Sequence, residues 1–226
     1  MRELLVNGAA DLGVCLNDAA VDRLFAYKEF LKEYNKKVNL TSIVDDEEIV
    51  VKHFLDSLTL VSELASGGRK VIDIGSGAGF PGVVLKIVME DLDLVLMDSL
   101  NKRIRFLNEL VGMLGLGGVR CVHGRAEELA RRPEYREGFD FAVARAVANL
   151  TKLSGYCLPY VRVGGMFIAM KGRNYHEDVS EADGAIKSLG GKILEVKEIG
   201  LPGSDIVHSI IKIEKIRSGI SRRGRA

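Results

Sequence analysis

One stretch, residues 71–82 with the sequence VIDIGSGAGFPG, constrains the fold of this chain more than any other. A β-branched, apolar run ends at Asp73, and Pro81 precedes a second apolar segment, 82–90. Between them lie three glycines at alternate positions: Gly75, Gly77 and Gly79. Glycine permits a sharp turn and a close approach of the backbone to a ligand, and proline suits the first turn of a helix. The stretch therefore predicts a strand, a tight glycine turn and the N-terminus of a helix.

The acid before the glycines favours one kind of ligand in this turn. Asp73 can face a cation, and S-adenosylmethionine carries an amine and a sulfonium, whereas a pyrophosphate is anionic. An acid two residues before a G-x-G-x-G run is typical of methyltransferases. Gly77, Gly79 and Gly82 also satisfy G-x-G-x-x-G, the dinucleotide fingerprint, so a nicotinamide-dependent oxidoreductase is the alternative.

Composition limits the class of protein. The 226 residues carry a formal net charge of +1 and are 47% hydrophobic, which suits one large domain with a small appendage. The chain has no apolar run of about 18 residues and no signal-peptide pattern, so we expect no membrane partner. Cys15, Cys121 and Cys157 lie far apart in apolar settings. We therefore expect buried reduced thiols, a cytoplasmic location and no metal site.

The predicted secondary structure changes at residue 69, from helices alone to alternating strands and helices. Before it, Asn17 and Asp45 can cap helices and apolar residues recur at helical spacing, which predicts a helical extension over 1–68, with a short flexible joint at 66–68. Strand and helix patterns alternate from 69 to 214, and residues 215–226 are predicted to form a basic tail.

Seven strands are predicted in the second region, at 70–74, 93–98, 118–123, 139–144, 165–170, 192–199 and 206–213. Helices are predicted near 82–90, 101–114, 125–131, 149–161 and 175–189. Such alternation produces a mostly parallel sheet with helices on both faces. The last two strands follow each other across the turn LPGSD, which makes an antiparallel hairpin. The pattern therefore predicts the α/β, Rossmann-like class I fold of S-adenosylmethionine-dependent methyltransferases.

In open α/β sheets, ligands bind beyond the carboxyl ends of the strands. The second strand ends at Asp98, about 20 residues after the glycine turn, where a carboxylate can accept both ribose hydroxyls. Its alternative role is a helix cap. The turn after the third strand carries Ala126 and Glu127, whose backbone N–H and carboxylate can bind the adenine edge; the acid can equally support a helix start.

Further side chains at strand ends are candidates for positioning. Arg145 ends the fourth strand, the position that faces the transferred methyl group in class I enzymes. Arginine stays protonated and cannot be a base, but it can hold a phosphate, a base carbonyl or the cofactor carboxylate; a surface salt bridge is the alternative. Lys171 ends the fifth strand, and His53 on an N-terminal helix is either structural or part of the site. No cysteine lies at a strand end facing the site, which argues against a thiolate nucleophile.

Basic residues lie near the same strand ends and on the N-terminal helices. The RNA-binding candidates are Lys52, Lys102, Arg103, Arg105, Arg125 and Arg173. Nucleic-acid binding needs a local basic surface rather than a basic protein, so a near-neutral net charge does not exclude it. Lys102 to Arg105 can also be an ordinary solvated helix face. The basic tail would add further RNA contacts.

Seven segments together resemble the glucose-inhibited division protein B family, bacterial 16S rRNA guanine-N7 methyltransferases also called small-subunit methyltransferase G. The segments are YNKKVNLTSI (34–43), KHFLDSL (52–58), VIDIGSGAGFPG (71–82), DSLNKRIRFL (98–107), GRAEEL (124–129), ARAVANL (144–150) and MKG (170–172). They occur in the family's order and span nearly all of the chain. Lys52 stands where the family usually has arginine, which keeps the charge and loses the planar fork.

The resemblance implies a class I methyltransferase domain with an N-terminal helical extension, S-adenosylmethionine as cofactor, and the guanine at position 527 of 16S rRNA as target. It places cofactor contacts at Gly75, Phe80, Ala126, Glu127 and Arg145, to which the residues themselves add Asp73, Gly77, Gly79 and Asp98. The implied partner is 16S rRNA, in the 30S subunit or its precursor, and we expect a monomer.

A guanine N7 target also fits a site without a base. N7 carries a lone pair and no proton, so positioning in line with the methyl group is the main requirement. The product base is cationic, which predicts that arginine and lysine groups lie away from N7. The N7 edge is inaccessible in A-form RNA, so the target is expected to be unpaired or splayed out. A methyltransferase of the same fold that acts on a small molecule or a protein is the other alternative.

Overall fold

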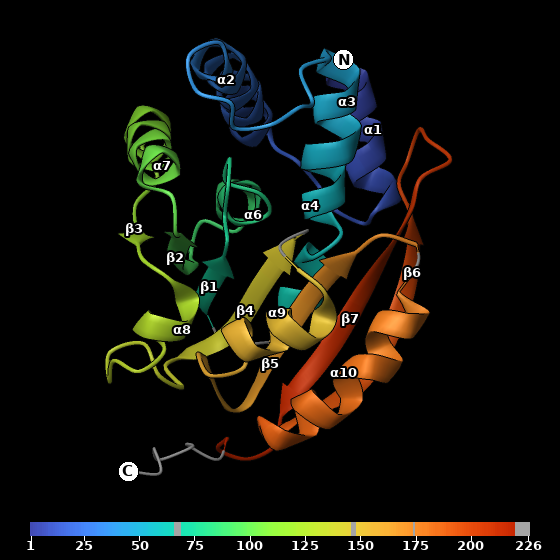
Figure 1. The fold of residues 1–226 in the computed structure, drawn as a ribbon. Helices are drawn as coiled ribbons and strands as arrows, with labels where there is room; N and C mark the ends of the chain where they lie inside the picture. The colour runs from blue at the N-terminus through green and yellow to red at the C-terminus, as the bar shows by residue number, and fades with distance from the viewer. Residues whose placement is uncertain (66–68, 146–147, 174, 220–226) are drawn as a thin grey trace.

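The computed structural model describes residues 1–65, 69–145, 148–173 and 175–219 (Figure 1). The predicted joint at 66–68 lies outside the described residues, as do Ala146 and Val147 of the segment ARAVANL and the tail residues 220–226.

A seven-stranded sheet in the order β3-β2-β1-β4-β5-β7-β6 runs through the molecule (Figure 1). Its strands are β1 (Lys70–Ile74), β2 (Asp93–Asp98), β3 (Val119–His123), β4 (Phe139–Arg145), β5 (Val161–Lys171), β6 (Gly191–Gly200) and β7 (Val207–Lys215). β1 to β5 pair in parallel, whereas β7 runs antiparallel to both β5 and β6. The predicted class I fold with its terminal hairpin is confirmed.

Helices cover both faces of the sheet (Figure 1). Those of the second region are α6 (Gly82–Val88), α7 (Asn101–Leu114), α8 (Ala126–Leu129), α9 (Leu150–Cys157) and α10 (His176–Ser188). Alternate residues of each strand point to opposite faces, which creates two cores. In β1, Val71 packs with α6, α7 and the N-terminal helices, while Ile72 packs with α8, α9 and α10.

The N-terminal extension is helical, as predicted, and it shares the first of these cores. Its elements are α1 (Arg2–Asp11), α2 (Asp18–Asn35), α3 (Asp46–Ile49), the π-helical segment η1 (Val50–Leu55), α4 (Asp56–Leu58) and α5 (Val61–Leu64). Asn17 caps α2 by accepting from the Ala20 N–H, and Asp45 caps α3 by accepting from two N–H groups. Because η1 continues directly into α4, residues 46–58 form one continuous helical stretch that packs on α1 and α6.

Several element boundaries differ from the sequence prediction. β5 begins at Val161 rather than 165, and α9 ends at Cys157 rather than 161. β7 extends to Lys215, which was predicted to belong to the tail and is instead buried. The ammonium group is accommodated because it donates to the carbonyls of Leu158 and Leu189 at 3.0 and 2.9 Å.

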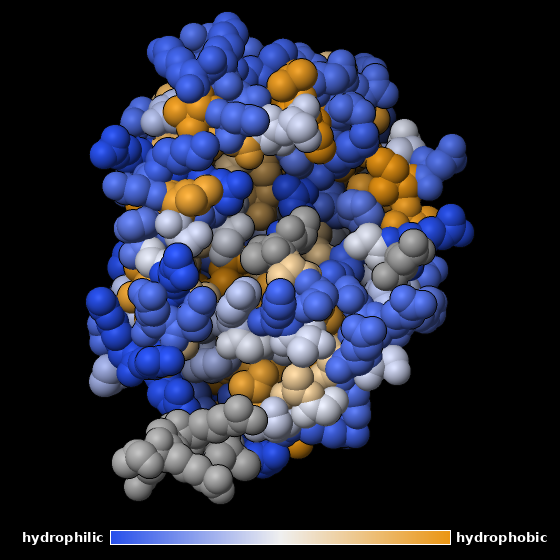
Figure 2. Space-filling view, in the orientation of Figure 1, coloured by the Kyte–Doolittle hydropathy of each residue, from blue (hydrophilic) through white to orange (hydrophobic). Residues whose placement is uncertain are grey.

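Two surface properties bear on the expectations from composition. All three cysteines are free; Cys157 is buried and Cys121 half-buried, but Cys15 is exposed in the connection between α1 and α2, contrary to prediction. Hydrophilic side chains cover most of the face shown in Figure 2, with apolar ones in small scattered groups. No helix among the described residues is long and apolar enough to span a membrane.

Candidate active site

The glycine turn after β1 forms as predicted. Gly75, Gly77 and Gly79 have φ angles of 77°, 59° and 98°, a region that residues with a side chain rarely adopt. A Cβ atom at Gly79 would also lie 2.6 Å from the hydroxyl oxygen of Tyr27 on α2. That hydroxyl donates to the carbonyl of Ala78, so the N-terminal extension braces the turn from outside.

Three adjoining cavities follow the carboxyl ends of the parallel strands. The central cavity, of about 390 Å³, is bordered by residues that include Thr41, His53, Gly75, Gly77, Phe80, Asp98, Arg103 and Arg145. The α8-side cavity, of about 310 Å³, is bordered by residues that include Gly75, Met97, Asp98, Leu100, Arg125, Ala126, Glu127 and Tyr156. The β7-side cavity, of about 690 Å³, is bordered by residues that include Thr41, Lys52, His53, Asp56, Arg145, Met170, Lys171 and His208. Because neighbouring cavities share residues, they form one hollow with Arg145 between the central and β7-side parts.

Asp73 lies in β1, two residues before the glycine turn, and is fully buried; it is not among the residues that line the three cavities. Its Oδ2 accepts from the Gly82 N–H at 3.0 Å and so caps α6, while Oδ1 has no hydrogen-bond partner among the described residues. Burial raises the pKa of this carboxyl group to about 7, although the Gly82 hydrogen bond and the Arg145 charge oppose the rise. A cationic ligand in the central cavity would favour the ionised form, which is the property expected beside the amine of S-adenosylmethionine.

Asp98 separates the central and α8-side cavities. Its Oδ1 accepts from the Leu100 N–H at 2.9 Å and shapes the turn into α7, so the helix-start role weighed from the sequence is present. Its Oδ2 accepts from the Gly77 N–H at 3.0 Å and from Arg103 at 3.2 Å. A carboxylate has about four acceptor positions, so about one is left for a ligand, fewer than two ribose hydroxyls require.

The α8-side cavity contains Ala126 and Glu127, the two residues that their place after the third strand predicts for the adenine edge. Ala126 starts α8, and its carbonyl accepts a 2.6 Å hydrogen bond from Tyr160, which fixes the start of the helix. Met97, Leu100 and Tyr156 supply apolar and aromatic surface of the kind that packs on a flat base.

Arg145, at the end of β4, is held by three groups of the N-terminal extension. Its Nη1 donates to the Lys52 carbonyl and to Asp56 Oδ2, each at 2.8 Å, and its Nη2 lies 3.1 Å from His53 Nδ1. The guanidinium also lies over the Phe80 ring, 5.1 Å from its centroid. The surface salt bridge considered from the sequence is excluded, because Asp56 is fully buried.

His53 is buried between Phe80 and Thr41. Its ring stacks on Phe80 at a centroid distance of 4.2 Å, and its Nε2 lies 3.2 Å from Thr41 Oγ1. Burial and the neighbouring Arg145 charge lower the pKa of His53 to about 3, so the imidazole is neutral at neutral pH. His53 Nδ1 lies 3.1 Å both from Arg145 Nη2, which can only donate, and from the Lys52 carbonyl, which can only accept, so Nδ1 has a partner in either tautomer. His53 therefore orients its neighbours and is not an acid at neutral pH.

The β7-side cavity contains Lys171 and two residues that the sequence did not reveal as candidates. Lys171 donates to the Ala148 carbonyl at 2.9 Å and pairs with Asp178 at 2.6 Å. Asp56 and His208 were missed. Asp56 lies one helical turn after His53 within KHFLDSL, a spacing that could have indicated it, whereas nothing in the sequence near His208 indicates the site.

The six basic candidates divide into two groups. Lys52, Arg103 and Arg125 border the cavities, and Arg103 is tied to Asp98 rather than facing outward. Lys102, Arg105 and Arg173 are exposed near the same strand ends. The Lys52 ammonium pairs with Glu48 at 2.5 Å, while its backbone carbonyl supports Arg145.

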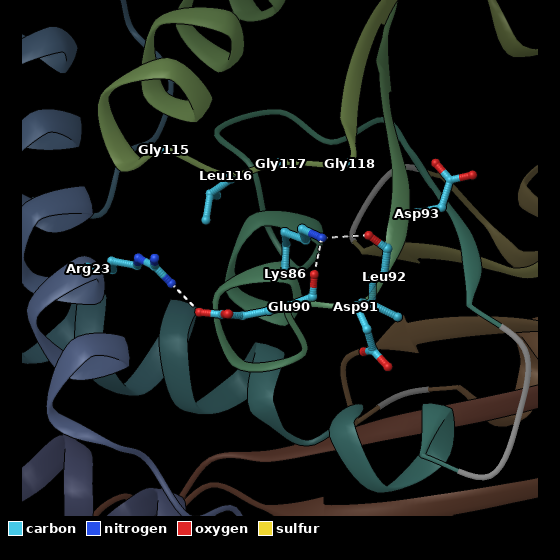
Figure 3. Close-up of a pocket in the computed structure, with 10 residues that line it drawn as sticks. All are labelled: Arg23, Lys86, Glu90, Asp91, Leu92, Asp93, Gly115, Leu116, Gly117 and Gly118. Carbon is cyan, nitrogen blue, oxygen red and sulfur yellow. Dashed lines mark hydrogen bonds and ion pairs between the residues drawn. The ribbon is translucent and has the colours of Figure 1, made fainter.

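A further cavity, of about 360 Å³, lies at the opposite, amino end of β2 and β3 (Figure 3). The buried Lys86 donates there to the carbonyls of Glu90 and Leu92, at 2.5 and 2.6 Å, and Arg23 pairs with the Glu90 carboxylate. These contacts hold the connection between the C-terminal end of α6 and β2 in place. The cavity is therefore a structural junction, far along the sheet from the glycine turn.

Comparison with known proteins agrees with this geometry. Residues 20–207 match the model of a family described as rRNA small subunit methyltransferase G. The ribosomal RNA small subunit methyltransferase G of Acetivibrio thermocellus is 51% identical over 217 residues, which cover 96% of this chain and 89% of the relative.

Solved structures support the fold alone. An Aquifex aeolicus S-adenosylmethionine-dependent methyltransferase superimposes with a TM-score of 0.56 at 18% identity, covering 81% of this chain and 98% of the other. M. jannaschii TYW2, solved with AdoMet, gives a TM-score of 0.53 at 13% identity, with 71% and 77% covered. The chain has a class I fold with a set of adjoining cavities at its glycine turn. The family model covers most of the chain and the sequence identity is high, and together these matches show that the chain belongs to the rRNA small subunit methyltransferase G family.

Proposed function

We propose that this protein transfers a methyl group from S-adenosylmethionine to N7 of a guanine in 16S rRNA, within the 30S subunit or its precursor. It acts as a monomer in the cytoplasm. Family membership supports the reaction class and the RNA substrate. The observation that carries the finer assignment is the hollow itself. Its central and α8-side cavities suit a nucleoside cofactor, and the larger β7-side cavity, on the other side of Arg145, is left for the target base.

The residues fit S-adenosylmethionine. Asp98 lies between the two cavities where a ribose would join an adenine to the rest of the cofactor. Asp73 is a buried carboxylate with one unpartnered oxygen among the described residues, two residues before the glycine turn. Among the described residues, a Cβ atom at Gly77 would meet only the Gly75 carbonyl, at 3.8 Å, which leaves room beside this glycine. When bound, the cofactor supplies an electrophilic methyl group, which guanine N7 can accept without losing a proton.

The charge around Arg145 suits a reaction that makes a cationic base. A bare guanidinium beside N7 would oppose the developing positive charge. Here Asp56 neutralises Arg145 at 2.8 Å, and His53 is neutral because burial lowers its pKa to about 3. The cluster can therefore donate hydrogen bonds to a carbonyl or carboxylate without adding a net positive charge at the junction. The chain's main contribution is alignment rather than acid–base chemistry.

RNA binding is assigned to the exposed cations around the hollow. Lys102, Arg105 and Arg173 can reach phosphates, and Lys171 lies within the β7-side cavity. Neutralising two of the exposed cations, as in Lys102→Ala combined with Arg105→Ala, should weaken RNA binding and reduce its dependence on salt. Unchanged affinity and salt dependence would remove α7 from the RNA interface.

The test of function is methyl transfer from labelled S-adenosylmethionine to three substrates that lack the modification: 30S subunits, precursor particles and free 16S rRNA. Nuclease digestion and mass analysis locate the label. We expect label on N7 of one guanine, sharply reduced by Arg145→Ala. Arg120→Ala is the matched control, because Arg120 is exposed on β3 with only a 3.9 Å contact to Asp93. Normal cofactor binding with no label on any RNA substrate would overturn the substrate assignment and leave the fold and cofactor intact.

A further inference from the structure

A buried carboxylate connects Arg145 to the C-terminal hairpin. Asp56 Oδ2 accepts from Arg145 Nη1 at 2.8 Å, and its Oδ1 lies 2.6 Å from His208 Nδ1. Asp56 lies in α4 of the N-terminal extension, while His208 lies on β7, 152 positions later in the chain. Three elements thus meet at one carboxylate: α4, β4 and β7.

The contacts of Arg145 restrict its guanidinium severely. A guanidinium has five N–H donors. Nη1 uses both of its hydrogens, on Lys52 and Asp56, and Nη2 lies 3.1 Å from His53 Nδ1. The Nε hydrogen and at least one Nη2 hydrogen are left for a ligand. Arg145 borders both the central and the β7-side cavities, so its guanidinium lies where cofactor and target base would meet.

His208 completes the environment of Asp56. The carboxylate is fully buried, and each of its oxygens has one charged or polar side-chain partner. With a single partner, a carboxylate can rotate about its χ2 angle and carry the bound guanidinium with it. With a partner on each oxygen, its plane is fixed. The His208 side chain itself is 30% exposed and borders the β7-side cavity, so its replacement opens no void in either core.

We propose that Asp56 and His208 are positioning residues, which together fix the guanidinium of Arg145 at the junction of the two cavities and thereby set the rate of methyl transfer. Neither residue needs to touch the cofactor or the base for this role. The expected effect on the rate of methyl transfer rests on the proposed function. The expected effect on Arg145 does not, because removal of the His208 donor should make the guanidinium more mobile whatever the substrate is.

The experiment compares two substitutions of similar size in the full-length protein. His208→Asn keeps an N–H donor close to the position of Nδ1, whereas His208→Leu removes it. We expect His208→Leu to lower kcat on 30S subunits at least tenfold while the Kd for S-adenosylmethionine stays within threefold and the far-ultraviolet circular dichroism spectrum is unchanged. His208→Asn should recover kcat to within threefold of the parent. Asp56→Asn is the second variant and should resemble His208→Leu.

A spectroscopic readout separates this inference from the substrate assignment. In protein labelled with ¹⁵N-arginine, the Arg145 Nε–H signal is assigned by its loss in Arg145→Lys, and rotation about the Nε–Cζ bond is measured. Rotation should be slow in the parent and in His208→Asn and at least tenfold faster in His208→Leu. Equal rotation in all three proteins, or equally slow catalysis by both His208 variants, would overturn the positioning role. Slow rotation in a parent protein that methylates no RNA would instead overturn the proposed function alone.

Discussion

The buried carboxyl group of Asp73 makes the stability of this protein depend on pH in an unusual direction. Its pKa is raised from 3.8 to about 7 because the group is fully buried with one oxygen unpartnered among the described residues. The folded state therefore binds a proton that the unfolded state has lost between about pH 4 and pH 7, and stability falls as pH rises through this window. At about 1.36 kcal/mol for each pH unit, the ionised group costs about 4 kcal/mol above pH 7.

The perturbation that tests this is Asp73→Asn. The amide keeps an oxygen that can accept from the Gly82 N–H but cannot ionise. The difference in unfolding free energy between variant and parent should therefore grow in favour of the variant by about 3 kcal/mol from pH 5 to pH 8. Other titrating groups, such as His53, are present in both proteins and cancel in this difference. Because the chain has no tryptophan, urea unfolding is followed by far-ultraviolet circular dichroism.

Cofactor binding should respond in the opposite sense. If the carboxylate faces a cation, the affinity of the parent for S-adenosylmethionine rises from pH 5 to pH 8, while that of Asp73→Asn is lower at pH 8 and less dependent on pH. Asp183→Asn is the control, since Asp183 is exposed and, in the part of the chain that the structure describes, pairs only with Lys187. A difference in stability that does not change between pH 5 and pH 8 would refute the reasoning about burial. Equal pH dependence of the affinity in both proteins would refute the idea that the Asp73 carboxylate faces a cationic group of the cofactor.

Three further substitutions probe how the site is supported. Tyr27→Phe removes the donor to the buried Ala78 carbonyl, so it should lower the free energy of unfolding in urea by about 1–3 kcal/mol and weaken cofactor binding. Tyr34→Phe removes an exposed hydrogen bond to Glu109 and should lower the free energy of unfolding by under about 0.5 kcal/mol. Gly79→Ala forces a Cβ to 2.6 Å from the Tyr27 hydroxyl at a φ of 98°, so calorimetry should show at least tenfold weaker cofactor binding; unchanged binding would mean that the turn adapts freely. Asp98→Asn should raise the Kd for S-adenosylmethionine about tenfold or more by calorimetry, because a charged acceptor is lost, and an unaltered Kd would remove Asp98 from the ribose site.

Local patterns were sufficient for the elements nearest the glycine turn. The bounds of β1, β2 and α7 were predicted to the residue, since each is marked by its own apolar periodicity and by adjacent turn residues. The start of β5 was missed because Gly164 and Gly165 lie in its first part, and glycines weaken a strand pattern. Lys215 was missed because a charged residue at a chain end is normally exposed, whereas here the carbonyls of Leu158 and Leu189 and the Glu137 carboxylate surround its ammonium group.

The sequence alone determined the fold class, the glycine turn and the carboxyl-end residues of the parallel strands, because these depend on short-range backbone preferences and on the rule that strand ends meet at one edge. Tertiary structure alone decided what those side chains do. The charge of Arg145 is neutralised by Asp56, and His53 is kept uncharged by burial. Asp98 accepts hydrogen bonds from Gly77, Leu100 and Arg103, which occupy most of its acceptor positions. The states of Arg145 and His53 and the Gly77 contact of Asp98 depend on residues distant in the chain, and the electrostatic character of a side chain depends on which groups exclude water around it.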